Sequence, residues 1–128
     1  MDLPFIYEQT LKMLKMWVPT VLLAWIPVYE ILIDEMDFEE NYKADAFDLI
    51  KALSDITQPL KARCGAVHIL SHLCRKVETN EFEKQLVPRV SNMSKDYNWE
   101  VRKAMVESLP SILDLLEGKP SLFDKYFL

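Results

Sequence analysis

The stretch that decides the fold is QPLKARCGAVHILSHLCRK, residues 58–76. Its apolar side chains recur at helical spacing in two neighbouring stripes. One stripe consists of Leu60, Cys64, Val67, Leu70 and Cys74, and the other consists of Ala62, Ala66, Ile69 and Leu73. A helix in an isolated hairpin needs one buried stripe, whereas a helix between the layers of a stack needs a wider apolar band. The two stripes therefore predict a stack of helical repeats.

The same pattern returns about 39 residues later in the chain. Residues 62–67 align with residues 101–106, and small, apolar and basic positions coincide. The preceding helices align with a shift of about 40, which places Phe47, Ile50 and Leu53 over Val87, Val90 and Met93. Pro4 and Pro88 lie about two periods apart, which indicates an earlier and divergent repeat.

The rest of the chain is also predicted to be helical, because no stretch alternates strictly between apolar and polar residues as a strand would. We expect one all-α domain over residues 1–128, with hairpins at about 1–36, 40–77 and 79–117 and a tail over 118–128. The predicted helices are 3–15, 20–35, 41–53, 58–76, 80–93 and 98–116, with a short seventh after Pro120. Asn80 with Glu83 fits a capping box, Asn98 fits the cap of the next helix, and residues 118–120 fit its end.

Composition excludes several classes of function. The two glycines, Gly65 and Gly118, are too few for a glycine-rich phosphate loop. The 15 lysines and arginines against 20 acids give a net charge of −5, which argues against nucleic acid as a partner. The uncharged run over residues 16–29 is shorter than the ~20 residues that cross a bilayer, so no membrane partner is expected. The sparse use of cysteine, and no basic stretch of the kind that begins a secretory signal, are typical of a protein of the cytosol or nucleus.

Residues 95–113, KDYNWEVRKAMVESLPSIL, resemble the second half of a HEAT repeat. Pro88 is similar to the proline that the first helix of such repeats often carries. In HEAT repeats the turn aspartate and the second-helix arginine form a ladder between neighbouring repeats, and Asp96 with Arg102 and Asp55 with Arg63 match these positions. The resemblance implies a right-handed α-solenoid of about three HEAT-like hairpins. The first hairpin departs from the pattern, because it has no arginine at the corresponding place.

Within the HEAT class, residues 55–113 are most similar to the scaffold subunit of protein phosphatase 2A and to regulatory subunits of protein phosphatase 4. This resemblance implies a non-catalytic scaffold or adaptor whose turns bind a phosphatase catalytic or regulatory subunit, with no cofactor. The partner-binding candidates are the turns over residues 55–58 and 94–99, and among them Asp55, Gln58, Lys95, Asp96, Asn98 and Trp99. Importins and adaptins contain similar repeats, so a transport or trafficking adaptor is the alternative.

The candidate residues also have purely structural interpretations. Trp99 fits either an anchor for a partner or a side chain that covers the turn beside it. The Asp–Arg pairs fit either partner binding or hydrogen bonds that join one repeat to the next, and their place in the repeat favours the second. The apolar cluster Met13, Met16, Trp17, Trp25 and Tyr29 fits core packing, contact with a further repeat, or a groove for a partner helix.

Cys64, His68 and His72 stand four residues apart on one helical face, a spacing that can hold a metal ion. A metal-binding, HEAT-like enzyme is therefore a further alternative. However, a fourth ligand is missing nearby, neither histidine is followed by glutamate, and Cys64 lies on an apolar stripe. We therefore expect a buried thiol and two surface imidazoles, with no catalytic residue and no metal.

Charge is segregated along the sequence. Residues 34–58 contain eight acids against two lysines, whereas residues 59–77 contain four basic residues and no acid. In a stack of helices this predicts an acidic and a basic ridge. Such ridges can steer a charged partner, and they are also common on solvated helical faces.

Overall fold

The computed structural model describes residues 2–116, and in this part of the chain every regular element is an α-helix. The seven helices are α1 (Leu3–Leu14), α2 (Pro19–Glu35), α3 (Glu40–Leu53), α4 (Leu60–Leu73), α5 (Thr79–Gln85), α6 (Val87–Ser94) and α7 (Trp99–Leu116). The predicted all-α class is confirmed. The predicted tail, the helix end over residues 118–120 and the short helix after Pro120 lie outside the described residues.

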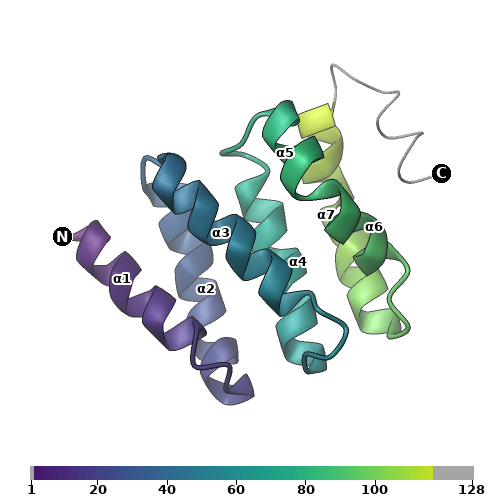
Figure 1. Ribbon diagram of the computed structural model, residues 1–128, viewed down its shortest axis with the longest axis horizontal. Helices are drawn as coiled ribbons and strands as arrows, with labels where there is room; N and C mark the ends of the chain where they lie inside the picture. Colours follow the sequence, from purple (N-terminus) through teal and green to yellow (C-terminus); the bar gives the residue numbers. More distant parts are fainter. Residues whose placement is uncertain (1, 117–128) are drawn as a thin grey trace.

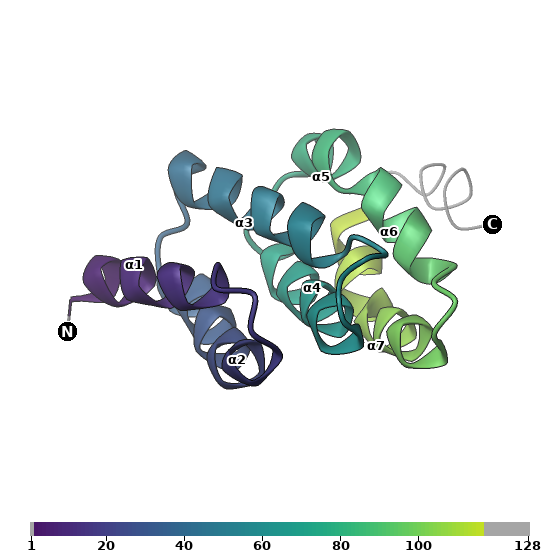
Figure 2. The ribbon, with the colours of Figure 1, turned by 60° about the horizontal axis from the view of Figure 1, so that its bottom comes forward.

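The helices form two layers (Figures 1 and 2). α1, α3 and the two short helices α5 and α6 make one layer, and α2, α4 and α7 make the other. Contacts between the layers join α1 to α2, α3 to α4, and α6 to α7, while α4 contacts both α2 and α7 within its own layer. The α1–α2, α3–α4 and α6–α7 connections consequently lie along one edge of the molecule, the lower edge in Figure 1.

Helix α4 is the centre of the core. Side chains from both of its predicted stripes are buried, with Ala62, Ala66, Val67, Ile69, Leu70 and Leu73 fully enclosed. The two-sided packing inferred from the stripes is therefore confirmed. A Cβ added at Gly65 would overlap Cδ1 of Ile26, so glycine at this position allows α2 and α4 to approach closely.

A buried polar network joins the first three helices. The Tyr7 and Tyr29 hydroxyls lie 3.1 Å apart, and the Tyr7 hydroxyl donates to the Asp45 carboxylate at 3.2 Å. Burial raises the pKa of both tyrosines, so both stay protonated and retain these hydrogen bonds. The Tyr7 ring also packs edge-on against Tyr42 and Phe38, which fixes α1 against the start of α3.

The single helix predicted over residues 80–93 is wrong, because the structure divides it into α5 and α6 at Leu86. Pro88 explains the break, since it has no N–H to bond the carbonyl of Lys84 four residues earlier and its ring crowds that carbonyl. The predicted capping box of Asn80 and Glu83 is also wrong. The box consists of Glu78 and Glu81, two residues earlier in the chain, and it begins α5.

The apolar run over residues 16–29 divides between core and surface. Leu22, Ile26 and Tyr29 are buried, whereas Met16 and Trp17 are exposed in the α1–α2 connection. Within residues 2–116, none of the helices combines the length and the apolar character that crossing a bilayer requires.

Candidate functional site

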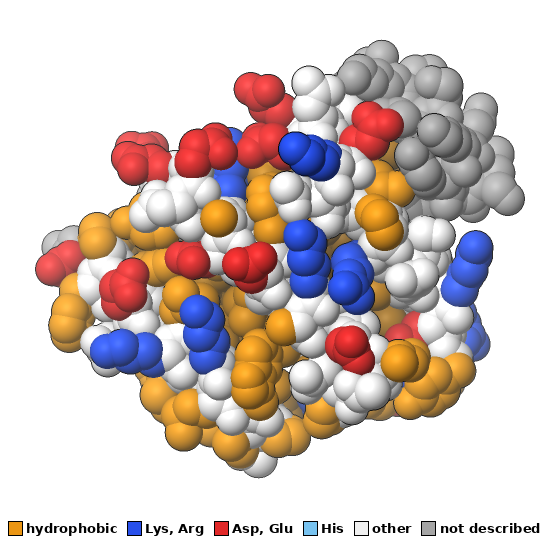
Figure 3. Space-filling view, viewed as in Figure 1, with side chains coloured by type: hydrophobic (Ala, Val, Ile, Leu, Met, Phe, Trp, Pro, Cys, Tyr) orange, Lys and Arg blue, Asp and Glu red, His pale blue; other side chains and the backbone are white. Residues whose placement is uncertain are grey.

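The three connections between paired helices expose most of their large apolar side chains. We call residues 15–18, 54–59 and 95–99 the turn edge. Its exposed apolar residues are Met16, Trp17, Val18, Ile56, Tyr97 and Trp99. Figure 3 shows hydrophobic side chains along this lower edge, whereas acidic side chains gather along the upper edge. Exposed aromatic residues are enriched where proteins bind one another, so the turn edge is the candidate site.

The third turn is built around the buried carboxylate of Asp96. Arg63, in the first turn of α4, donates from Nε at 3.0 Å and from Nη2 at 3.4 Å to the two carboxylate oxygens. Both side chains are only 3% exposed. Arg63 also donates to the carbonyl of Gln58 at 2.6 Å, and Arg102 donates to the backbone carbonyl of Asp96 at 2.6 Å. These bonds fix the second and third turns relative to each other.

The observed contacts differ from the Asp–Arg pairs that the sequence suggests. Arg63 does not pair with Asp55 but with Asp96 of the following turn. Arg102 bonds the backbone, and not the carboxylate, of Asp96. Asp55 is exposed and accepts hydrogen bonds from the backbone N–H and hydroxyl of Thr57, which lower the pKa of its carboxyl.

Tyr97 and Trp99, the aromatic residues of the third turn, are positioned by a helix cap and by two basic side chains. Asn98 accepts the Glu100 N–H at 3.0 Å and thereby caps α7, so Trp99 begins the helix in a fixed orientation. The Lys103 ammonium lies 6.0 Å from the centre of the Trp99 ring, and the Arg63 guanidinium lies 4.9 Å from that of Tyr97. Trp99 nevertheless remains 60% exposed and Tyr97 71% exposed, so both rings can contact a partner.

The first turn contains the one non-glycine residue with a positive φ angle among residues 2–116. Trp17 has a φ of 58°, in the left-handed region. This conformation costs a residue with a Cβ atom roughly 1–2 kcal/mol. It directs the chain from α1 into α2 and leaves the indole ring partly exposed on the turn edge. Such strained positions are concentrated at functional sites, which supports including Trp17 in the candidate site.

A hollow of about 320 Å³ lies between the second and third turns. Its lining consists of Ser54, Asp55, Ile56, Arg89, Asn92, Met93 and Asp96. The half-buried Arg89 forms no ion pair or hydrogen bond with any residue that the structure describes, although Asp55 is near enough to feel its charge. The exposed Ile56 supplies apolar surface in the same hollow, and the buried Met93 lines it from the core. The hollow can therefore accept a side chain that combines an anionic group with apolar contacts.

A second groove, of about 360 Å³, lies between α2 and α4. It is lined by Leu23, Ile26, Pro27, Glu30, Lys61, Cys64, Gly65 and His68. Because Pro27 has no N–H, the carbonyl of Leu23 lacks its usual helical donor. This groove offers a largely apolar surface with Glu30, Lys61 and His68 among its lining residues, on the layer formed by the second helices.

The proposed metal ligands do not come together. Within residues 2–116, no three side chains of the metal-binding types converge on a common point. His72 instead lies between two carboxylates of α2, with Nδ1 2.9 Å from Asp34 and Nε2 3.5 Å from Glu30. His68 is exposed and Cys64 is half-buried in the groove. His72 therefore joins α4 to α2.

The remaining predicted residues lie at the turn edge in different roles. Lys95 is exposed after the end of α6, and Gln58 contributes its backbone carbonyl to Arg63. Tyr97 and Ile56 lie inside the predicted turns. Sequence reasoning missed Arg89, because nothing in the sequence indicates that it faces a hollow.

Comparisons of the chain with family models, with curated protein sequences and with solved structures found no match.

Proposed function

We propose that this chain is a non-catalytic scaffold or adaptor, built as a solenoid of three HEAT-like hairpins, which binds a protein partner on its turn edge. The row of exposed apolar side chains on three adjacent connections is the observation that carries the proposal. The bonds among Arg63, Asp96 and Arg102 support it, because an ordered surface loses little conformational entropy when it binds. A stack of hairpins also offers an extended surface without a deep pocket.

The proposed partner is a catalytic or regulatory subunit of a serine/threonine phosphatase of the 2A or 4 type. This choice rests on the resemblance of residues 55–113 to HEAT-repeat subunits of those phosphatases. A place in the cytosol or nucleus belongs to the same proposal. The test is to measure binding of the purified chain to the purified catalytic subunits of phosphatases 2A and 4 by calorimetry or interferometry.

Replacing Trp99 by alanine should weaken that binding about 30-fold or more, because an exposed aromatic anchor of an interface typically contributes at least about 2 kcal/mol. The matched control is Ile31→Ala, since Ile31 is 61% exposed near the opposite end of α2. The control should bind as the natural chain does, and circular dichroism should show that both variants are folded. Equal binding by both variants, or no binding to either catalytic subunit, would refute the proposal.

The groove between α2 and α4 favours a second candidate, an adaptor that binds an extended peptide across the second helices. Leu23→Asp would place a charge in this groove without touching the turn edge. If Leu23→Asp abolishes the binding of a partner and Trp99→Ala leaves it intact, the result favours the transport or trafficking adaptor over the phosphatase scaffold.

A further inference from the structure

The turn edge, taken together with the helix ends that flank it, is basic although the chain as a whole is acidic. These helix ends and turns, residues 11–22, 50–63 and 91–103, contain eight lysines and arginines and three acids. Arg63 and Asp96 neutralise each other, which leaves seven basic residues against Asp55 and Glu100. The net charge of the whole chain is −5, so the positive charge is concentrated at this edge.

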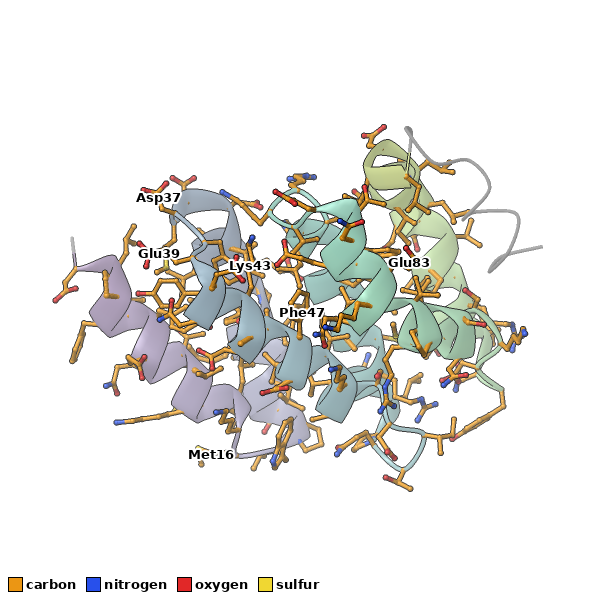
Figure 4. All side chains as sticks on the ribbon, turned by 45° about the horizontal axis from the view of Figure 1, so that its top comes forward. Met16, Asp37, Glu39, Lys43, Phe47 and Glu83 are labelled. Atoms are coloured by element: carbon orange, nitrogen blue, oxygen red, sulfur yellow. The ribbon has the colours of Figure 1, made fainter. Side chains whose placement is uncertain are left out.

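The opposite edge is acidic in balance. Residues 31–43, at the α2–α3 connection and its flanking helix ends, contain five acids and a single lysine, and residues 74–78, between α4 and α5, add Arg75 and Lys76 against Glu78. That lysine, Lys43, is already paired with Glu40 and Glu81, at 3.4 and 3.1 Å. Figure 4 shows Asp37 and Glu39 at this edge and Met16 at the other. An acidic segment of a partner would therefore be attracted to the turn edge and repelled from the other.

At the turn edge, the hollow between the second and third turns supplies a guanidinium donor for a carboxylate. Arg89 lines it without an ion pair or hydrogen bond among residues 2–116, and a guanidinium can bind a carboxylate through two parallel hydrogen bonds. Two carboxylates also line the hollow: Arg63 neutralises that of Asp96, and Asp55 shares the field of Arg89. Ile56 and Met93 line the same hollow, and the exposed rings of Tyr97 and Trp99 follow directly along the third turn. A cationic hydrogen-bond donor and apolar contacts thus lie next to each other.

We propose that this hollow binds an aspartate or glutamate of a partner protein, within an acidic segment whose leucine or aromatic residues pack on Tyr97 and Trp99. The inference rests on the proposed scaffold function and specifies the chemistry of its partner. An acidic segment fits better than a basic or neutral one, because the surrounding lysines and arginines add long-range attraction to the contact made by Arg89.

The test uses the full chain and three labelled synthetic peptides, with binding measured by fluorescence anisotropy. The first peptide alternates Asp or Glu with Leu and Phe, the second has lysine in place of each acid, and the third has serine in place of each apolar residue. We expect only the first to bind well, and its affinity to fall several-fold between about 50 and about 300 mM salt. Arg89→Gln should weaken its binding about tenfold or more.

The matched control is Arg75→Gln, because Arg75 is an exposed arginine beyond the opposite end of α4. Equal binding of the first peptide to Arg89→Gln and to the natural chain would overturn the inference, as would equal binding of the lysine peptide. If a single-stranded oligonucleotide binds more tightly than the first peptide, and Arg89→Gln weakens that binding, the inference is overturned in favour of nucleic acid. If the natural chain forms dimers and Arg89→Gln abolishes them, the inference is overturned, because the occupant of the hollow is then a second copy of this chain.

The two proposals fail in different ways. If a phosphatase catalytic subunit binds through Trp99 while the acidic peptide does not bind, this inference is refuted and the proposed function stands. If the acidic peptide binds as expected and neither catalytic subunit binds, the inference stands and the proposed phosphatase partner is refuted.

Discussion

Replacing Arg63 by alanine should lower the free energy of unfolding by about 3–5 kcal/mol, because it leaves a carboxylate buried without its partner charge. Arg63 and Asp96 are each 3% exposed, so the carboxylate would lose its charged partner at a site where bulk solvent screens it little. The carboxylate would retain the N–H of Asn98, at 2.9 Å, as a donor. The carbonyl of Gln58 and the ring of Tyr97 would lose their contacts with Arg63 in the same step.

Urea unfolding followed by circular dichroism measures this loss. The control is Arg75→Ala, since Arg75 is exposed and lies 3.7 Å from Asp34. An exposed pair of this kind contributes about 0–1 kcal/mol. If Arg63→Ala and Arg75→Ala lower the free energy of unfolding by similar amounts, the Arg63–Asp96 pair does not hold the second and third turns together.

Replacing Leu70 by alanine should cost about 2–5 kcal/mol, because the site is enclosed on all sides and a cavity would remain. Leu70 is 0% exposed near the end of α4, the helix that contacts α2, α3 and α7. The effect should reach all three helical pairs, so the whole chain should unfold in one transition at lower urea concentration.

The comparison for Leu70 is Leu113→Ala, because Leu113 lies on α7 and is 45% exposed. Its loss should be well below that of Leu70→Ala. If Leu70→Ala lowers the free energy of unfolding no more than Leu113→Ala does, or if the α1–α2 pair unfolds in a separate transition, α4 is not the centre of the core.

The helical class and the role of α4 could be predicted because both depend on local periodicity. Two apolar stripes on residues 58–76 require neighbours on two sides, whichever residues supply them. The break at Leu86 was missed although Pro88 was noticed, since prolines are also accommodated inside helices here, at Pro27 in α2 and Pro110 in α7. Which proline interrupts a helix depends on the packing around it, and the sequence does not contain that information.

Part of the candidate site could likewise be found from the sequence. Asp96, Asn98 and Trp99 follow one another in a single turn, and the repeat pattern points to that turn directly. The partner of His72 could not be found, because Asp34 comes from another helix and lies 38 residues away in sequence. Arg89 was missed for the same reason, since the hollow that it lines is formed by two separate turns.

The central claim is that the helical pairs lie side by side, so that their turns form one edge. The most direct test is a disulfide between α4 and α7, where the hydroxyls of Ser71 and Ser111 lie 3.3 Å apart. Ser71→Cys and Ser111→Cys would be introduced together after replacing Cys64 and Cys74 by serine. Pairing Ser71→Cys with Ser94→Cys, at the turn end of α6, is the control.

Mild oxidation should link positions 71 and 111 within one chain, as seen by mass spectrometry, because a disulfide forms readily only between residues whose Cα atoms lie within about 7 Å. The control pair should stay reduced. If positions 71 and 111 remain unlinked, or if the control pair forms as readily, then the second and third helical pairs are not adjacent and the turn edge does not exist.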